Sequence, residues 1–240
     1  MIGFLRYLAS FVGFTSWYGV QILGSALLGV KHRTGGIYDR ASRGWARGML
    51  WGTGITTRVE GREGLDPSVP VVYVANHASF VDIWALLAEF PGTIRFVYKR
   101  QMDWIPVFGL CLRAMHHIAI DRKKRSQTFA AYDAAAERIR EGISAVVFVE
   151  GTRSTDGRLL PFKKGSFILA LSAEAPVVPV FCENTHALMR RGSFSPKPGV
   201  VTLRVGAAIP TSGLSYADRD QLSAQARVAL IGLGAQEGSG

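Results

Sequence analysis

Short apolar runs alternate with longer stretches of helical pattern over most of this sequence. The runs are rich in Val, Ile and Phe and predict strands at residues 71–76, 94–99, 117–120, 144–149, 177–182 and 200–206. The stretches between them predict helices at residues 81–90, 107–115, 126–141, 165–173 and 216–231. This alternation predicts an α/β fold with a mixed, largely parallel central sheet flanked by helices. Ligands of such sheets bind at the carboxyl ends of the strands.

An uncharged apolar segment covers residues 7–30, ahead of the alternating pattern. It is long enough to cross a bilayer as a helix, but its glycines and aromatic residues also fit a helix that bends and lies in one leaflet. A buried helix of a soluble protein and a cleaved signal peptide are further alternatives. We expect a hydrophobic membrane-binding helical segment with a basic flank over residues 1–57, and a second domain over residues 58–240.

Basic side chains are abundant, and several follow directly after the apolar segment, among them Lys31 and Arg33. The positive-inside rule predicts that this flank lies on the cytoplasmic side of a membrane. The net charge is +10 although 48% of the residues are hydrophobic, which favours an anionic partner such as nucleic acid, a membrane surface or a phosphorylated substrate. The sequence has no nucleic-acid-binding motif, so we expect a phospholipid bilayer and no nucleic acid. Basic clusters at residues 123–125, 163–164 and 190–191 are expected to be solvated or to face anionic head groups.

The sequence offers few thiols and no spacing typical of a metal site. Cys111 and Cys182 are too few for a disulfide framework and are expected as buried thiols in a reducing compartment. His116 and His117 are adjacent at the start of a predicted strand, where neighbouring side chains point to opposite faces. We therefore expect no metal site.

His77 and Asp82 are the most informative candidate site residues. An imidazole that titrates near neutral pH, beside a carboxylate that orients it, can remove a proton from a hydroxyl. Five helical steps of about 100° place two side chains about 140° apart, so the pair cannot face each other on one regular helix. We expect His77 in the turn after the strand and Asp82 early in the following helix. The alternative is a packing or capping histidine followed by an ordinary helix-start acid.

Four short blocks follow one another along the chain. They are N-H-x-x-x-x-D at residues 76–82, I-x-I-D-R at 118–122, E-G-T-R at 150–153 and a V-P-V-type block at 175–180. In content and order they resemble the blocks of the glycerolipid acyltransferase family, most closely its 1-acylglycerol-3-phosphate acyltransferase branch. One position departs from the family pattern, because His116 stands where the second block usually opens with Gly. We expect this ring to narrow the pocket or to change which substrate fits.

The resemblance implies transfer of a fatty acyl group from acyl-CoA or an acyl carrier protein to the free hydroxyl of 1-acylglycerol-3-phosphate, which gives phosphatidic acid without a metal or other cofactor. In this chemistry His77 Nε2 takes the hydroxyl proton and Asp82 accepts a hydrogen bond from Nδ1–H. The resemblance further implies that Arg153, Arg122 and Lys99 bind the phosphate of the lysophospholipid acceptor. The supporting residues of the blocks are Asn76, Glu150, Gly151 and Thr152, of which Glu150 has the alternative role of holding Arg153.

Several alternatives remain open at this point. A covalent acyl-enzyme on Ser79, Cys111 or Cys182 is a rival mechanism, but none of the three lies in a nucleophile elbow, so we favour direct attack in a ternary complex. The acceptor can be another lyso-lipid, such as lyso-ornithine lipid. A non-catalytic protein that binds lipid or an anionic membrane is the alternative of another class. We expect a membrane-associated enzyme whose active site faces the cytoplasm.

Overall fold

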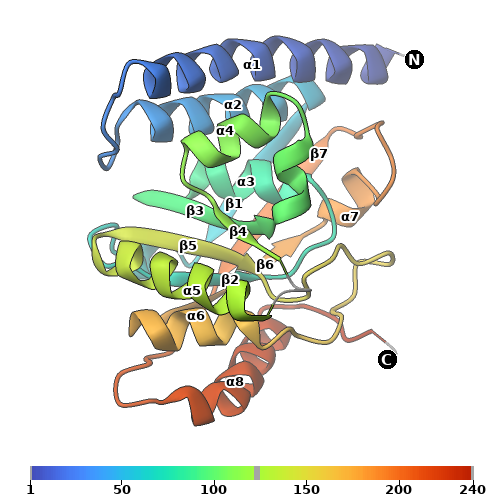
Figure 1. The fold of residues 1–240 in the computed structure, drawn as a ribbon. Helices are drawn as coiled ribbons and strands as arrows, with labels where there is room; N and C mark the ends of the chain where they lie inside the picture. The colour runs from blue at the N-terminus through green and yellow to red at the C-terminus, as the bar shows by residue number, and fades with distance from the viewer. Residues whose placement is uncertain (1, 122–124, 239–240) are drawn as a thin grey trace.

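The computed structural model describes residues 2–121 and 125–238 of the 240-residue chain (Figure 1). Its strands are β1 (Ile55–Glu60), β2 (Val72–Ala75), β3 (Thr93–Lys99), β4 (Ile118–Ile120), β5 (Ile143–Phe148), β6 (Val177–Glu183) and β7 (Gly199–Val205). Its α-helices are α1 (Ile2–Leu27), α2 (Ile37–Thr53), α3 (Val81–Glu89), α4 (Phe108–Ala114), α5 (Arg125–Arg140), α6 (Gly165–Ala173), α7 (Thr185–Leu188) and α8 (Arg219–Gly232). The 3-10 helices are η1 (Arg62–Gly64), η2 (Arg100–Trp104) and η3 (Tyr216–Asp218).

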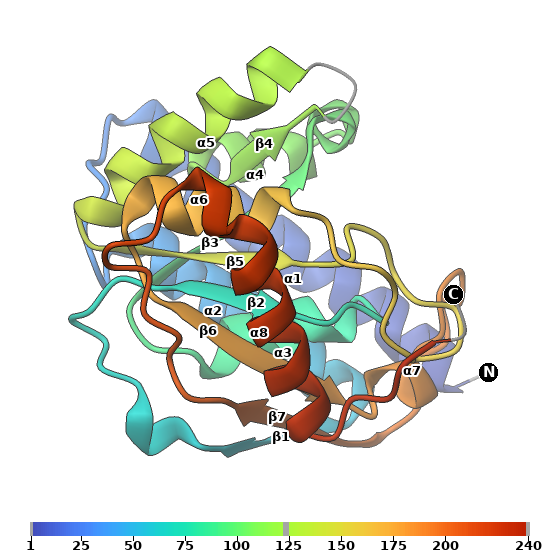
Figure 2. The same ribbon diagram turned by 90° about the horizontal axis from the view of Figure 1, so that it is seen from below.

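The strands form one sheet in the order β1-β7-β6-β2-β5-β3-β4. Neighbouring strands run parallel, except that β6 and β7 are antiparallel. Helices cover both faces of the sheet, with α1, α2, α3 and α4 on one side and α5, α6 and α8 on the other (Figures 1 and 2). The predicted α/β fold with a mixed, largely parallel sheet is therefore confirmed.

The centre of the sheet is buried on both faces because consecutive side chains of a strand point in opposite directions. In β2, Tyr73 belongs to the core under α2 and α3 with Trp84, whereas Val74 belongs to the core under α5, α6 and α8 with Phe167. This explains why the interior strands are continuous Val-, Ile- and Phe-rich runs in the sequence. The predicted strands and helices are all present, while β1 and α7 were not predicted and α2 was predicted only as part of the segment over residues 1–57.

Helices α1 and α2 form an antiparallel pair that packs through a row of glycines. Gly44, Gly48 and Gly52 of α2 lie one turn apart and face Tyr18, Phe14 and Ser10 of α1. A Cβ added at Gly48 would lie 2.6 Å from the Phe14 ring. The absence of side chains along this face of α2 is what lets α1 approach so closely.

A buried ion pair fastens α2 to the sheet. Arg95 of β3 donates a hydrogen bond of 2.8 Å to Asp39 Oδ1 in the first turn of α2. The other oxygen of Asp39 accepts hydrogen bonds from the Thr93 hydroxyl and from the backbone N–H of Gly35. Because both charges are buried, removal of either partner would leave an uncompensated charge inside the protein.

The outer face of α1 is apolar and exposed. Trp17 and Val20 are 65% and 72% exposed, and Phe4, Leu8 and Val12 nearer the N-terminus are exposed as well. None of the described helices, α1 included, combines the length and the apolar character that crossing a membrane requires.

Candidate active site

His77 lies in the turn between β2 and α3, and Asp82 lies in the first turn of α3. His77 Nδ1 and Asp82 Oδ2 are 2.7 Å apart. This confirms the expectation that the pair is formed across the strand–helix turn and not along one helix. The Asp82 side chain is fully buried, while 14% of the His77 side chain is exposed, so the imidazole connects a buried carboxylate to an accessible cavity.

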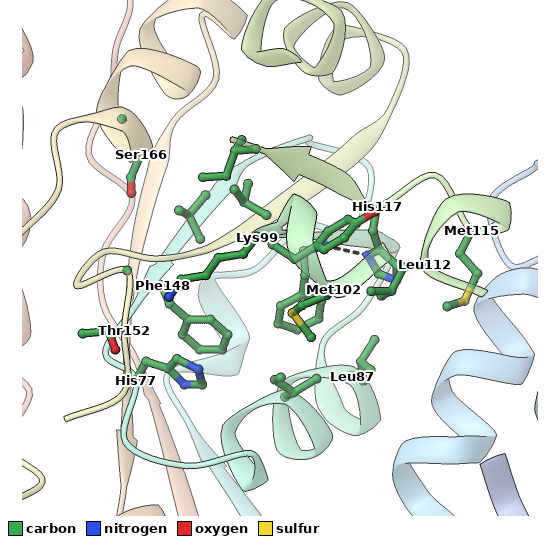
Figure 3. Close-up of a pocket in the computed structure, with 18 of the residues that line it drawn as sticks. His77, Leu87, Lys99, Met102, Leu112, Met115, His117, Phe148, Thr152 and Ser166 are labelled. Carbon is green, nitrogen blue, oxygen red and sulfur yellow. Dashed lines mark hydrogen bonds between the residues drawn. The ribbon is translucent and has the colours of Figure 1, made fainter. Parts of the chain in front are cut away.

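The surroundings of Asp82 fix the orientation of the imidazole. Asp82 Oδ2 also accepts hydrogen bonds of 2.9 Å from the backbone N–H groups of Ala78 and Ser79. Because this oxygen is an acceptor, the neutral form of His77 carries its hydrogen on Nδ1 and has its lone pair on Nε2. The ring stacks on Phe148 at a centroid distance of 3.8 Å and an angle of 12° (Figure 3). The free nitrogen is thereby held in one place as a proton acceptor.

Glu150 supports the backbone of the site. Its two oxygens accept hydrogen bonds from the N–H groups of His77, at 2.8 Å, and Leu160, at 3.1 Å. Its partners are thus backbone groups, and the alternative that this carboxylate holds Arg153 is wrong. Burial raises the pKa of Glu150 to about 7, against the opposing effect of the two N–H donors.

Asn76 has a comparable structural role. Its amide Nδ2 donates to the carbonyl of Cys182, at 3.2 Å, and its Oδ1 accepts from the N–H of the same residue, at 2.7 Å. This pair of bonds extends the pairing of β2 with β6 beyond the end of β2, and fixes the point at which the chain turns toward His77. Gly151 and Thr152 line the cavity beside it, and Gly151 has a φ of +69°, which a side chain would strain.

Cationic side chains converge on the same cavity. Arg153 and Lys99 line it together with Arg191, and the Arg191 guanidinium donates to the carbonyl of Arg153 at 3.2 Å. The Arg153 guanidinium lies 4.2 Å from the centroid of the Phe80 ring. Burial lowers the pKa of Arg153, and the nearby charge of Arg191 lowers it further. Arg122, the other expected phosphate ligand, lies outside the described residues.

Three cations that the sequence predicts in solvated or lipid-facing clusters lie at the cavity wall. They are Arg191, Lys163 and Lys164. The sequence around each of these cations does not indicate that it lies at the cavity, because the cavity is formed by loops that follow different strands. A basic residue in a loop after a parallel strand is the signal that points to them.

The cavity has a volume of about 870 Å³ and a predominantly apolar wall away from His77. In Figure 3, His77 and Thr152 lie at one end of the drawn group, and Leu112 and Met115 lie toward the other. Apolar side chains of α3, η2 and α4 line this second region together with Met115, the residue after α4, and they include Leu87, Met102, Cys111 and Leu112. Helix α1 adds Tyr18, Gly19 and Ile22 to the wall.

The two adjacent histidines have different surroundings. His116 has a φ of +58°, the region that favours Gly, and its ring stacks on His32 at 3.9 Å. It is not among the described residues that line the cavity, so the expectation that it narrows the pocket is wrong. His117 is buried and does line the cavity. No group of three or more His, Cys, Asp or Glu side chains is placed to hold a metal ion in the described part of the chain.

The alternative nucleophiles are poorly placed or poorly activated. The Ser79 hydroxyl is buried and donates to the carbonyl of Met189 at 2.8 Å. Burial raises the pKa of the Cys111 thiol and, well above its usual range, that of Cys182. A thiol with a raised pKa is a weak nucleophile at neutral pH, so the geometry favours His77 acting as a base over a covalent acyl-enzyme.

An oriented base, several cations and a deep apolar cavity together define a group-transfer site that can activate a hydroxyl beside an apolar chain. The family model described as Acyltransferase matches residues 56–183, and the chain belongs to this family.

Named relatives agree with this assignment. The chain is 35% identical to a 1-acyl-sn-glycerol-3-phosphate acyltransferase of Limnanthes douglasii, over 73% of this chain and 61% of that protein. It is 30% identical to the human 1-acyl-sn-glycerol-3-phosphate acyltransferase beta, over 84% of this chain and 73% of that protein. The crystal structure of the 1-acyl-sn-glycerophosphate acyltransferase PlsC of Thermotoga maritima superposes with a TM-score of 0.77 at 26% identity, covering 96% of this chain and 93% of that one. The chain spans less than two thirds of the length of the plant relative.

Proposed function

We propose that this protein transfers a fatty acyl group from a thioester, acyl-CoA or acyl-carrier-protein, to the free hydroxyl of 1-acylglycerol-3-phosphate. The product is phosphatidic acid. The observation that carries the proposal is the His77–Asp82 pair, of which His77 lines an apolar cavity, with Arg153 lining the same cavity. The names of the relatives support the choice of acceptor.

The reaction needs one base that later becomes an acid. His77 Nε2 takes the hydroxyl proton as the hydroxyl oxygen attacks the thioester carbonyl, and Asp82 stabilises the imidazolium that forms. When the tetrahedral intermediate collapses, the carbon–sulfur bond breaks and the departing thiolate takes the proton from Nε2. An ester and a free thiol result, and His77 is neutral again. No covalent acyl-enzyme is needed.

The cations and the apolar cavity bind different parts of the substrates. Arg153, which can grip a phosphate through two N–H groups, binds the glycerol phosphate with Lys99 and Arg122, and Arg191 adds a further positive charge. The apolar region beyond Phe148 receives an acyl chain. The enzyme works at a membrane, with the exposed apolar face of α1 in the lipid and the active site on the cytoplasmic side. Residues 1–57 form the membrane-binding part and residues 58–240 the acyltransferase domain.

The test measures free thiol release by the purified, detergent-solubilised protein with lysophosphatidic acid and each thioester donor. Thiol release that depends on the acceptor supports acyl transfer, and the comparison of donors identifies the thioester. The His77→Ala variant is expected to bind lipid vesicles normally and to transfer no acyl chain. A non-catalytic lipid-binding protein would show no acceptor-dependent thiol release with either variant, and that result would refute the proposal.

The acceptor is tested through the phosphate. Arg153→Ala is expected to raise the KM for lysophosphatidic acid at least tenfold, because a charged hydrogen-bonded pair is lost. Arg158→Ala is the matched control, since this Arg is exposed in the same loop and does not line the cavity. If Arg153→Ala raises the KM for lyso-ornithine lipid by the same factor, the loss is not specific to phosphate, and a phosphate-free acceptor is favoured instead.

A further inference from the structure

A buried imidazole lies in the wall of the cavity, away from the reacting groups. His117 is 9% exposed and lines the cavity together with Leu112 and Met115. Figure 3 shows its ring beside Leu112, well separated from His77. Three ring-to-ring steps connect the two histidines, His77 to Phe148 at 3.8 Å, Phe148 to Phe96 at 5.8 Å, and Phe96 to His117 at 6.0 Å. A chain that reaches His117 from the thioester therefore passes several carbons along the cavity.

The protonation of His117 follows from its one hydrogen bond to the protein. The backbone N–H of Phe96 donates to His117 Nδ1 at 2.8 Å. Nδ1 is thus an acceptor and carries no hydrogen, so the neutral ring has its hydrogen on Nε2. Burial and the positive charges of Arg95 and Arg138 lower the pKa of His117 well below its usual range. The ring is therefore neutral, with a single N–H donor.

That donor has no partner in the described protein. Among the described residues His117 Nε2 makes no hydrogen bond, and it is not one of the fully buried side-chain atoms that lack a partner, so it opens toward the cavity that the ring lines. A donor that opens onto a predominantly apolar cavity is left unpaired when a plain hydrocarbon chain displaces the water around it, which is unfavourable. Ser42, another polar residue of this wall, differs in this respect, because its hydroxyl donates to the carbonyl of Tyr38 at 2.6 Å.

We propose that His117 Nε2–H is a specificity site that donates a hydrogen bond to an oxygen carried within the acyl chain. The preferred acyl group then bears a hydroxyl or carbonyl oxygen several carbons beyond the thioester, and a plain hydrocarbon chain of the same length leaves the donor unpaired. This inference rests on the proposed acyl transfer, because it places the acyl chain in the cavity.

The test compares a plain acyl-CoA with monohydroxylated acyl-CoAs of equal length that carry the hydroxyl at different carbons. The wild type is expected to prefer one hydroxylated position, with a gain in kcat/KM of roughly tenfold, the factor that one net hydrogen bond provides. In His117→Asn, the Asn oxygen replaces Nδ1 as the acceptor for Phe96 N–H, while the Nε2–H donor is removed. This variant is expected to transfer the plain chain and to lose the preference.

The neighbouring histidine provides the matched control. His116→Asn removes an imidazole outside the cavity, at a φ of +58° that Asn tolerates, and is expected to keep the preference. Equal kcat/KM for all donors in the wild type, as expected if only water meets the donor, would overturn the inference, and so would a preference that survives in His117→Asn. Both results leave transfer of the plain chain intact, whereas failure of the proposed function abolishes transfer of every donor.

Discussion

The buried carboxyl group of Glu150 makes the stability of the fold depend on pH near neutrality. Its pKa is raised from the ordinary value of 4.5 to about 7 by burial. Because the folded state holds this proton more tightly than the unfolded state, the stabilisation is fully present below pH 4.5 and is lost as the pH rises through 7. At about 1.4 kcal/mol per pKa unit, the loss amounts to about 3 kcal/mol.

Glu150→Gln imitates the protonated acid at every pH and should remove this dependence. We expect the difference in unfolding free energy between the variant and the wild type to change by about 3 kcal/mol between pH 4.5 and pH 8, in favour of the variant at high pH. Urea unfolding followed by tryptophan fluorescence in a constant detergent measures it, since all other titrating groups cancel in the difference.

Glu63→Gln is the control, because Glu63 is exposed in η1 and should show no such change. A difference between Glu150→Gln and the wild type that stays constant from pH 4.5 to pH 8 would refute the reasoning. It would mean that the two N–H donors, and not burial, determine the protonation of this carboxyl group in the folded protein.

Three further predictions concern the frame around the site. Asn76→Ala removes both hydrogen bonds to β6 and leaves two buried backbone groups unpaired. We therefore expect the free energy of unfolding, measured in urea, to fall by about 2–4 kcal/mol. An unchanged midpoint of urea unfolding would contradict the role of this amide. Gly48→Leu places a side chain where the Phe14 ring lies and should separate α1 from α2, seen as faster proteolysis within α1 and a lower melting temperature. Trp104 in η2 is 86% exposed, and Trp104→Ser should weaken binding to anionic vesicles. Phe194, in the loop after α7, is 63% exposed, and Phe194→Ser should leave this binding unchanged. Equal vesicle binding by the two variants would exclude η2 from the membrane surface.

The parts of the fold that the sequence predicts best are those with the strongest local pattern. The buried strands β2, β5 and β6 are continuous apolar runs and were predicted to within a residue or two. Strand β1 was missed because its sequence, ITTRVE, alternates polar and apolar residues at the edge of the sheet. Helix α7 has four residues, too few for a helical period to be recognised.

The His77–Asp82 pair was predictable because it depends on one strand–helix turn. The helical angle between His77 and Asp82 excludes a single helix, and the structure places the pair across the turn. The partners of Glu150 and Asn76 could not be predicted, because each bonds a residue that is far away in the chain, 73 positions for Glu150 with His77 and 106 positions for Asn76 with Cys182. Contacts of that separation are decided by strand order, which a local pattern does not contain.

His116 shows how a departure from a family pattern can be misinterpreted. The expectation took the usual Gly to make room for a substrate. The structure indicates a backbone reason, because the residue has a positive φ, which Gly adopts without strain. The ring that replaces it turns away from the cavity and lies against His32 in the α1–α2 connection.

Helix α1 lies at the outer surface of the protein and also forms part of the cavity wall. Its apolar outer face is separated from this cavity by the thickness of a single helix, and a Cβ added at Gly19 would lie 3.4 Å from Val107, the residue before α4. In the proposed function, α1 therefore lies between the lipid and the cavity that receives the acyl chain. Deleting the helix to obtain a more tractable protein would therefore open the cavity to solvent, and a loss of the proposed activity would not measure the loss of membrane anchoring alone.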